Sequence, residues 1–126
     1  MTVVMRIIQN FDARHEGDFL ALEKKFAELE AVRPDYPNGT RLQPISSTEP
    51  CNTLVWQCEF PDIETAHKTL DFFHGDDAHE ALLKKQLPYF RDVRIEFYEK
   101  LGWEKSGTLP DDTAGVNKVT MRKRLG

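Results

Sequence analysis

The chain has 126 residues, of which 40% are apolar and 30% charged, and its formal net charge at pH 7 is −4. This length fits one domain with one core, and an acidic balance argues against a nucleic-acid-binding protein, which needs a basic face. No apolar run approaches the roughly 20 residues that span a bilayer, and the N-terminal stretch lacks a basic leader. We therefore expect a cytoplasmic protein that binds neither nucleic acid nor membrane.

The first half of the chain is predicted as strand, helix and edge strand. Alternation predicts a strand at Val3–Phe11. Asp18 is expected to cap a helix that runs to Val32, and residues 40–48 are expected to form an edge strand because Pro44 cannot donate to a ladder. The helix has an apolar stripe at Phe19, Leu22, Phe26 and Leu29 and is expected to expose Glu23, Lys24, Lys25, Glu28 and Glu30.

The second half is predicted as strand, helical pair and strand. Residues 52–60 and 92–99 alternate between apolar and polar side chains, as half-buried strands do. Residues 62–87 repeat at helical spacing, and a glycine divides them into two helices. The expected helix ends are Asp62 as N-cap, Gly75 as C-terminal stop, and Asp77 with Glu80 as a capping box for the short last helix.

This order of elements predicts an α+β, ferredoxin-like βαββαβ fold with an antiparallel four-stranded sheet. Right-handed connections place the helices on one face of the sheet. The helix-covered face is expected to be apolar, whereas the open face is expected to carry paired charges. The covered face takes Met5, Ile7, Leu54, Trp56, Cys58, Val93, Ile95 and Phe97, and the open face takes Val4, Arg6, Ile8, Val55, Gln57, Glu59, Arg94, Glu96 and Tyr98.

The chain also contains two cysteines and a basic C-terminal segment. Cys51 and Cys58 point to opposite faces of one strand, so we expect two free thiols. Residues 113–126 carry four basic side chains and no acid, which leaves −8 on the rest. We therefore expect residues 102–126 to form a linker and a basic arm, with residues 116–124 extended on an acidic surface of a partner subunit.

The order of the elements and the mixed open face resemble those of the dimeric α+β barrel superfamily. Two runs of residues also resemble that superfamily, namely Phe72-Phe73-His74-Gly75-Asp76-Asp77-Ala78-His79 and Leu87-Pro88-Tyr89-Phe90. The resemblance covers about residues 3–101, so residues 1–101 are expected to form the barrel domain. It implies a homodimer in which two sheets pack open face to open face. That superfamily includes cofactor-free monooxygenases, NIPSNAP-type proteins and haem enzymes.

The pair Asn52-x-x-x-Trp56 resembles a motif of cofactor-free quinol monooxygenases in that superfamily. The resemblance implies that Asn52 holds a substrate oxygen and that Trp56 stacks on a flat ring. Asn10 is similar in position to a second asparagine of those enzymes, although alternation places it on the other face unless Phe11 sits in a bulge. The tyrosine and arginine that accompany the motif are not evident here. The alternative reading is a core tryptophan beside a turn asparagine.

Three histidines near the helical pair are the second candidate. His67, His74 and His79 have the composition of a metal or haem site, together with Asp76 and Asp77, but not its spacing. The alternative is that the aspartates cap a helix and the histidines lie in solvent. We expect no metal and no cofactor. His67 is a candidate general base because its ordinary pKa lies near working pH, and His74 and Tyr89 are candidate ligand contacts.

Charged side chains on the open face are a third candidate, either as a polar pocket or as a balanced dimer interface.

The sequence leads to two functional hypotheses. One is a cofactor-free monooxygenase-like enzyme that acts on a small aromatic or quinol-type molecule. The alternative is a non-catalytic dimeric module that binds a small molecule or is purely structural. A cavity of at least about 300 Å³ beside Trp56 separates them, because a filled core cannot admit a ligand.

Overall fold

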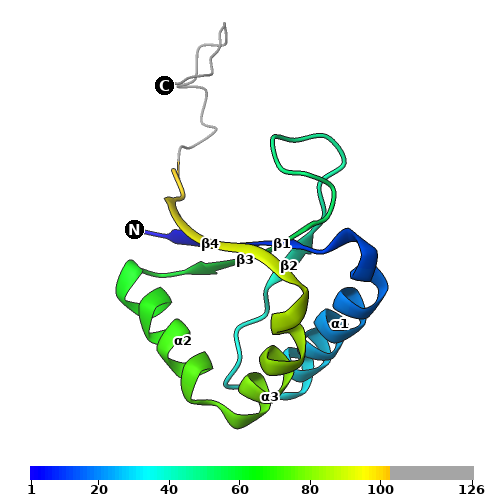
Figure 1. Ribbon diagram of the computed structural model, residues 1–126. Helices are drawn as coiled ribbons and strands as arrows, with labels where there is room; N and C mark the ends of the chain where they lie inside the picture. Colours follow the sequence, from blue (N-terminus) through cyan, green and yellow to red (C-terminus); the bar gives the residue numbers. More distant parts are fainter. Residues whose placement is uncertain (103–126) are drawn as a thin grey trace, which may run out of the picture.

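The computed structural model describes residues 1–102, which contain one four-stranded sheet with the order β2-β3-β1-β4 (Figure 1). Every neighbouring pair of strands is antiparallel. This is the arrangement expected of a ferredoxin-like fold. The strands are β1 (Val3–Phe11), β2 (Thr40–Leu42), β3 (Thr53–Phe60) and β4 (Phe90–Glu99).

All the helices in residues 1–102 lie on the same side of this sheet (Figure 1). The long helix α1 lies beneath one half of the sheet and α2 beneath the other, while α3 packs against α1 and also contacts α2. The predicted α+β architecture is thereby confirmed. The helices are α1 (Glu16–Val32), α2 (Ile63–Gly75) and α3 (Asp77–Gln86), with short 3-10 turns η1 (Ala13–His15) and η2 (Leu87–Tyr89).

Alternation along the strands sets the core, as predicted. Met5 lies opposite Cys58 on β3, and Ile7 lies opposite Trp56, all on the helix-covered face. Two clusters of buried side chains fill the space between sheet and helices. The larger contains Met5, Tyr36, Trp56, Cys58, Phe60, Ala66 and Phe73, and the smaller contains Phe11, Phe19 and Leu54.

Two of the predicted helix starts are wrong. Helix α1 begins at Glu16, and Asp12 rather than Asp18 caps the preceding turn η1 by accepting a hydrogen bond from the Arg14 amide. Helix α3 is capped by Asp76, which accepts from the amide of His79, so Asp77 is the first helical residue. In both places the acceptor is the aspartate with extended backbone angles, as an N-cap requires.

The predicted edge strand at residues 40–48 is too long, because β2 ends at Leu42. The chain then leaves the sheet edge, and residues 43–52 cross to the side opposite the helices (Figure 1). Glu49 holds this loop there by an ion pair with Arg94 and by accepting a hydrogen bond from Asn10. An ion pair outside the ladder thus replaces the strand pairing that Pro44 would interrupt.

Other expectations concern parts that the structure does not describe. The basic arm expected at residues 116–124, like the rest of the segment from residue 103, lies outside the described residues. Within residues 1–102, Cys51 is exposed and Cys58 buried, and both are free. No helix in this part of the chain is long and apolar enough to cross a membrane.

Asp76 ties the turn before α3 to the loop after α1. Its carboxylate accepts from the Arg33 guanidinium at 2.8 Å, from the Tyr36 hydroxyl and from the His79 amide at 3.1 Å. The bond from Arg33, followed by the bond from Tyr36, lowers the pKa of Asp76 to about 2. The charged carboxylate is therefore favoured by the folded state.

This shift predicts a pH-dependent contribution to stability. The unfolded chain binds more protons than the folded one between pH values of about 4 and 2, so the Asp76 contribution is present above pH 4 and is lost as the pH falls to 2. We expect Asp76→Asn to flatten this part of the profile of unfolding free energy against pH. The control is Asp71→Asn, at an exposed α2 carboxylate without these contacts. Equal pH profiles for the two variants would contradict the assignment.

Candidate functional site

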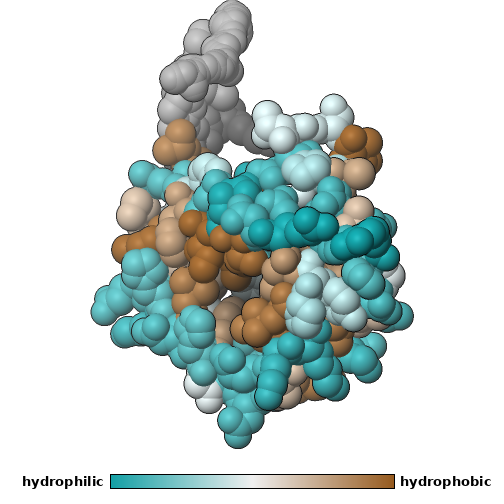
Figure 2. Space-filling view, viewed as in Figure 1, coloured by the Kyte–Doolittle hydropathy of each residue, from teal (hydrophilic) through white to brown (hydrophobic). Residues whose placement is uncertain are grey.

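A cavity of about 300 Å³ opens between the sheet and the helices beside Trp56. Figure 2 shows it as a hollow surrounded by apolar side chains. Val93 and Ile95 of β4 border the cavity and are nearly half exposed, because the helices do not close over this end of the covered face. The other apolar side chains of the wall are Ile7, Phe26, Tyr36, Trp56, Leu70, Phe73, Leu83, Leu87 and Phe90.

The Trp56 indole is fixed between a glycine and an aromatic ring. The ring of Phe73 meets it edge to face, with centroids 6.0 Å apart. On Gly39, a Cβ atom would lie 2.0 Å from the indole Nε1. The backbone before β2 therefore approaches the indole more closely than any other residue type would allow. Trp56 is only 4% exposed, so it combines a core position with a surface on the cavity.

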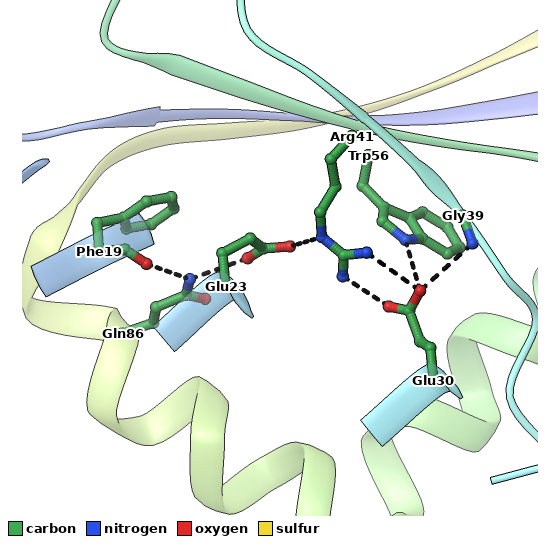
Figure 3. A network of polar contacts seen from close by, with 7 residues as sticks. All are labelled: Phe19, Glu23, Glu30, Gly39, Arg41, Trp56 and Gln86. Carbon is green, nitrogen blue, oxygen red and sulfur yellow. Dashed lines mark hydrogen bonds and ion pairs between the residues drawn. The ribbon is translucent and has the colours of Figure 1, made fainter. Parts of the chain in front are cut away.

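Two carboxylates and one guanidinium form the polar wall of the cavity (Figure 3). Arg41 of β2 donates from Nε to Glu23 at 2.7 Å, and from Nη1 and Nη2 to the two oxygens of Glu30 at 3.1 and 2.6 Å. Both carboxylates are more than nine-tenths buried. The prediction that Glu23 and Glu30 cover the outside of α1 is therefore wrong, since Arg41 binds them under the sheet.

Neutral donors complete this cluster. Glu30 Oε1 also accepts from the Gly39 amide at 3.3 Å and from Trp56 Nε1 at 3.5 Å, while Glu23 Oε1 accepts from the Gln86 amide at 3.0 Å. Burial of Arg41 opposes its charge, but its bonds to Glu30 and Glu23 outweigh burial and raise its pKa. The guanidinium therefore stays charged, and every carboxylate oxygen of the cluster has a donor.

His79 borders the same cavity. Its imidazole stacks on Phe73 with centroids 4.7 Å apart and planes 1° apart, and it also contacts Phe26. Burial, opposed by nearby Glu80 and Asp76, lowers the pKa of His79, so the ring is neutral at neutral pH. Its Nδ1 atom is buried and has no hydrogen-bond partner among the described residues. A neutral imidazole in this position can accept a proton from a bound molecule.

The structure brings together only some of the residues predicted for the site. Trp56 and His74 border the cavity, whereas Asn52, Asn10, His67 and Tyr89 do not. His67 is exposed, and its ring lies against Phe97 with centroids 5.1 Å apart. The Tyr89 ring instead contacts the imidazole of His15, the last residue of η1.

Both asparagines hold backbone segments or strands in place. Asn52 donates to the backbone carbonyl of Phe11 at 2.6 Å, which joins the ends of β1 and β3. Pairing of β1 with β4 is irregular between Asn10 and Phe11, yet Asn10 stays on the open face. There it donates to the Thr53 hydroxyl at 2.6 Å and to Glu49. Each amide thus already has a structural partner in this part of the chain.

The histidines near the helical pair do not converge. His74 is exposed and lies 3.8 Å from Glu80, while His79 faces the cavity. Among residues 1–102, no three histidine, cysteine, aspartate or glutamate side chains are grouped so that they could hold a metal ion.

Sequence reasoning missed the polar wall, although helical spacing contained the signal. Glu23 and Glu30 lie four residues after the buried Phe19 and Phe26, on the same stripe of α1. Gln9 was likewise missed, although alternation along β1 places it with Ile7 on the covered face. It is 8% exposed and borders the cavity.

Comparison with known proteins identifies the fold. No family model and no curated protein matches the sequence. A NIPSNAP family protein from Agrobacterium tumefaciens matches 82% of this chain and 89% of its own, with 8% identity and a TM-score of 0.67. A NIPSNAP domain protein from Burkholderia xenovorans matches 84% and 100%, with 17% identity and a TM-score of 0.65. An antibiotic biosynthesis monooxygenase matches 80% and 99%, with 15% identity and a TM-score of 0.60.

These identities are low, so the likeness concerns the fold. The solved structures that share it are described as NIPSNAP proteins and an antibiotic biosynthesis monooxygenase, and the predicted ferredoxin-like fold is confirmed. The residues that border the cavity have to be interpreted from their own chemistry.

Gly39→Ala tests the contact that positions Trp56. The added methyl group has to displace the indole, and overpacking of this kind costs about 1–3 kcal/mol of unfolding free energy. Urea unfolding measures this cost. Gly17→Ala is the matched control, because a Cβ atom at Gly17 in the first turn of α1 meets nothing within 4 Å. We expect this control to be neutral or up to about 1 kcal/mol more stable. Equal stability of both variants would refute the close approach.

Proposed function

We propose that this protein binds a small aromatic molecule in the cavity beside Trp56 and oxidises a quinol-type substrate with O₂, without a bound cofactor. The observation that carries the proposal is an aromatic-walled cavity of about 300 Å³ in a core of this size. A cavity of roughly 150 Å³ holds benzene, so a two-ring molecule fits. Trp56 and Phe73 supply flat surfaces for ring contacts.

His79 is the proposed general base. Its neutral imidazole borders the cavity and can take the proton of a quinol hydroxyl, which makes the ring electron-rich. The quinol and O₂ then give a hydroxyquinone and water: one oxygen atom enters the ring, the other leaves as water, and the quinol supplies all the electrons. His67, expected to be the base from the sequence, does not border the cavity. The solved structure described as an antibiotic biosynthesis monooxygenase supports this class of reaction by its fold.

Oxidation of 1,4-naphthohydroquinone under ¹⁸O₂ tests the reaction. We expect 2-hydroxy-1,4-naphthoquinone with one ¹⁸O atom, formed faster than in protein-free buffer. His79→Gln should lower this rate about 100-fold or more, whereas the exposed His67→Gln should leave it unchanged.

The alternative function, a non-catalytic binding module, predicts a different result in the same assay. Saturable binding of the quinol with no ¹⁸O-labelled product would favour a non-catalytic binding module. Absence of binding would contradict the proposal altogether. Leu83→Phe, which fills the cavity, should weaken binding, whereas Ala81→Phe on the exposed side of α3 is the matched control.

We also propose that two copies pack open face to open face. Tyr98 stays nearly half exposed there beneath the Arg6 guanidinium, 5.0 Å from its ring centroid. The loop 43–52 rises beside this face, and a hollow of about 410 Å³ separates it from Arg6, Ile8 and Val55. Ile8 is already buried in the single chain, so a second sheet would remove from water chiefly the half-exposed Tyr98 and the partly exposed Val55.

Light scattering at micromolar concentration tests this assembly. We expect a dimer with a buried area of at least about 1,200 Å². Val55→Arg on the open face should shift the mass toward the monomer, whereas Val32→Arg, at the exposed end of α1, should not. A monomeric mass for the unmodified protein would contradict the proposal.

A further inference from the structure

Gln9 is a largely buried residue at the edge of the cavity. It lies on β1 between Leu54 and Val93, is 8% exposed, and borders the cavity. Its side chain makes no hydrogen bond to any residue in the described part of the chain. An amide carries two donors and an acceptor, and among the described residues the fully buried side-chain polar atoms without a partner are His79 Nδ1 and one Glu80 oxygen, so the Gln9 amide atoms are not sealed in the core. This amide is therefore available to a molecule in the cavity.

The charges on the cavity wall do not balance. Glu23 and Glu30 carry two negative charges, and Arg41 carries one positive charge, so the cluster has a formal charge of −1. No lysine and no second arginine borders the cavity. All three nitrogen atoms of Arg41 already donate to the two carboxylates. An anionic ligand would therefore find no free cation and would meet a net repulsion that burial strengthens.

The remaining titratable groups at the cavity do not change this balance. His79 is neutral at neutral pH, since burial lowers its pKa. His74 stands at the exposed rim beside Glu80, which offsets any charge it carries. The Gln86 amide, a neutral donor, is already taken up by Glu23 and by the Phe19 carbonyl.

We propose that Gln9 binds the polar group of the ligand, and that the Glu23–Arg41–Glu30 cluster restricts the ligands to aromatic molecules with a neutral, hydrogen-bond-donating or a cationic head, to the exclusion of carboxylates. This inference rests on the proposed function, because it needs a ligand in the same cavity. It limits the ligands of the cavity to neutral phenols and quinols and to aromatic molecules with an alkylammonium head. It also assigns the polar contact to a residue outside the Asn52–Trp56 motif.

Three ligands with one ring system test the charge selection. Calorimetric titration of the full chain at pH 7 compares 2-naphthol, 2-naphthylmethylamine and 2-naphthoate, which carry neutral, positive and negative heads. We expect the first two to bind at least about ten times more tightly than naphthoate. Equal binding of all three would overturn the inference and leave the proposed function intact. Binding of none would overturn the proposed function itself.

Matched variants test whether the Glu23–Arg41–Glu30 cluster causes the exclusion of carboxylates. Glu23→Gln makes the cluster neutral and should bring the affinity for naphthoate to within about threefold of the affinity for naphthol. Glu30→Gln also makes the cluster neutral and should have the same effect. Glu28→Gln is the control, because it removes one negative charge from the exposed side of the same helix. If Glu28→Gln relieved the exclusion as fully as Glu23→Gln, overall charge would explain the preference and the role of the cluster would be refuted.

Gln9→Leu tests the polar contact, because it keeps the volume and removes the amide. We expect naphthol to bind about 2- to 12-fold more weakly, the loss of one hydrogen bond. Thermal unfolding without ligand should be little changed, because the Gln9 amide makes no hydrogen bond that the substitution would remove. Unchanged affinity for naphthol in a folded Gln9→Leu variant would overturn the assignment of Gln9.

Discussion

The hydrogen bonds of Glu30 hold the site together. This carboxylate on α1 accepts from Arg41 on β2, from the backbone of Gly39 and from the indole of Trp56 on β3 (Figure 3). One side chain thereby fixes the helix, the segment that leads into the edge strand and the central tryptophan. Removing one partner of a buried ion pair costs about 3–5 kcal/mol, because the other charge is left unpaired.

The cavity follows from this constraint. Arg41 and its two carboxylates occupy one side of the space beneath the sheet, and polar groups held in a fixed geometry cannot collapse into a gap as apolar side chains do. Phe73 and His79 stack as a parallel pair that also borders the cavity. Together these fixed groups keep open a volume that loosely packed aliphatic residues would fill.

How much of the fold could be predicted depends on the range of the interaction. Alternation in β1, β3 and β4 is a local signal, and it gave the faces of the sheet and the covering helices. The length of β2 depends on Glu49 meeting Arg94, far along the chain, so no local pattern reveals it. At α3 the adjacent aspartates Asp76 and Asp77 could each serve as the cap, and only the backbone angles show that Asp76 does so. At α1 the preceding turn η1, which Asp12 caps, moves the start of the helix ahead of Asp18.

The candidate site was harder to predict than the fold. Trp56 was identified because it belongs to a pair that resembles a known motif. The other member of the pair, Asn52, joins the ends of two strands and does not border the cavity. Glu23 and Glu30 were interpreted as exposed because carboxylates are rarely buried. The positive charge of Arg41 offsets the cost of burying these two carboxylates, and the three-residue strand β2 places Arg41 beside them.

The central claim is that the cavity beside Trp56 admits an aromatic ligand. The most direct measurement is the ¹H–¹⁵N spectrum of the Trp56 indole in a Trp103→Phe background during titration with 2-naphthol. Ring currents and any change at Glu30 act on the Nε1–H group at the cavity wall. We predict a saturable shift of this resonance that Leu83→Phe abolishes. A resonance that stays in place at millimolar naphthol would contradict the account.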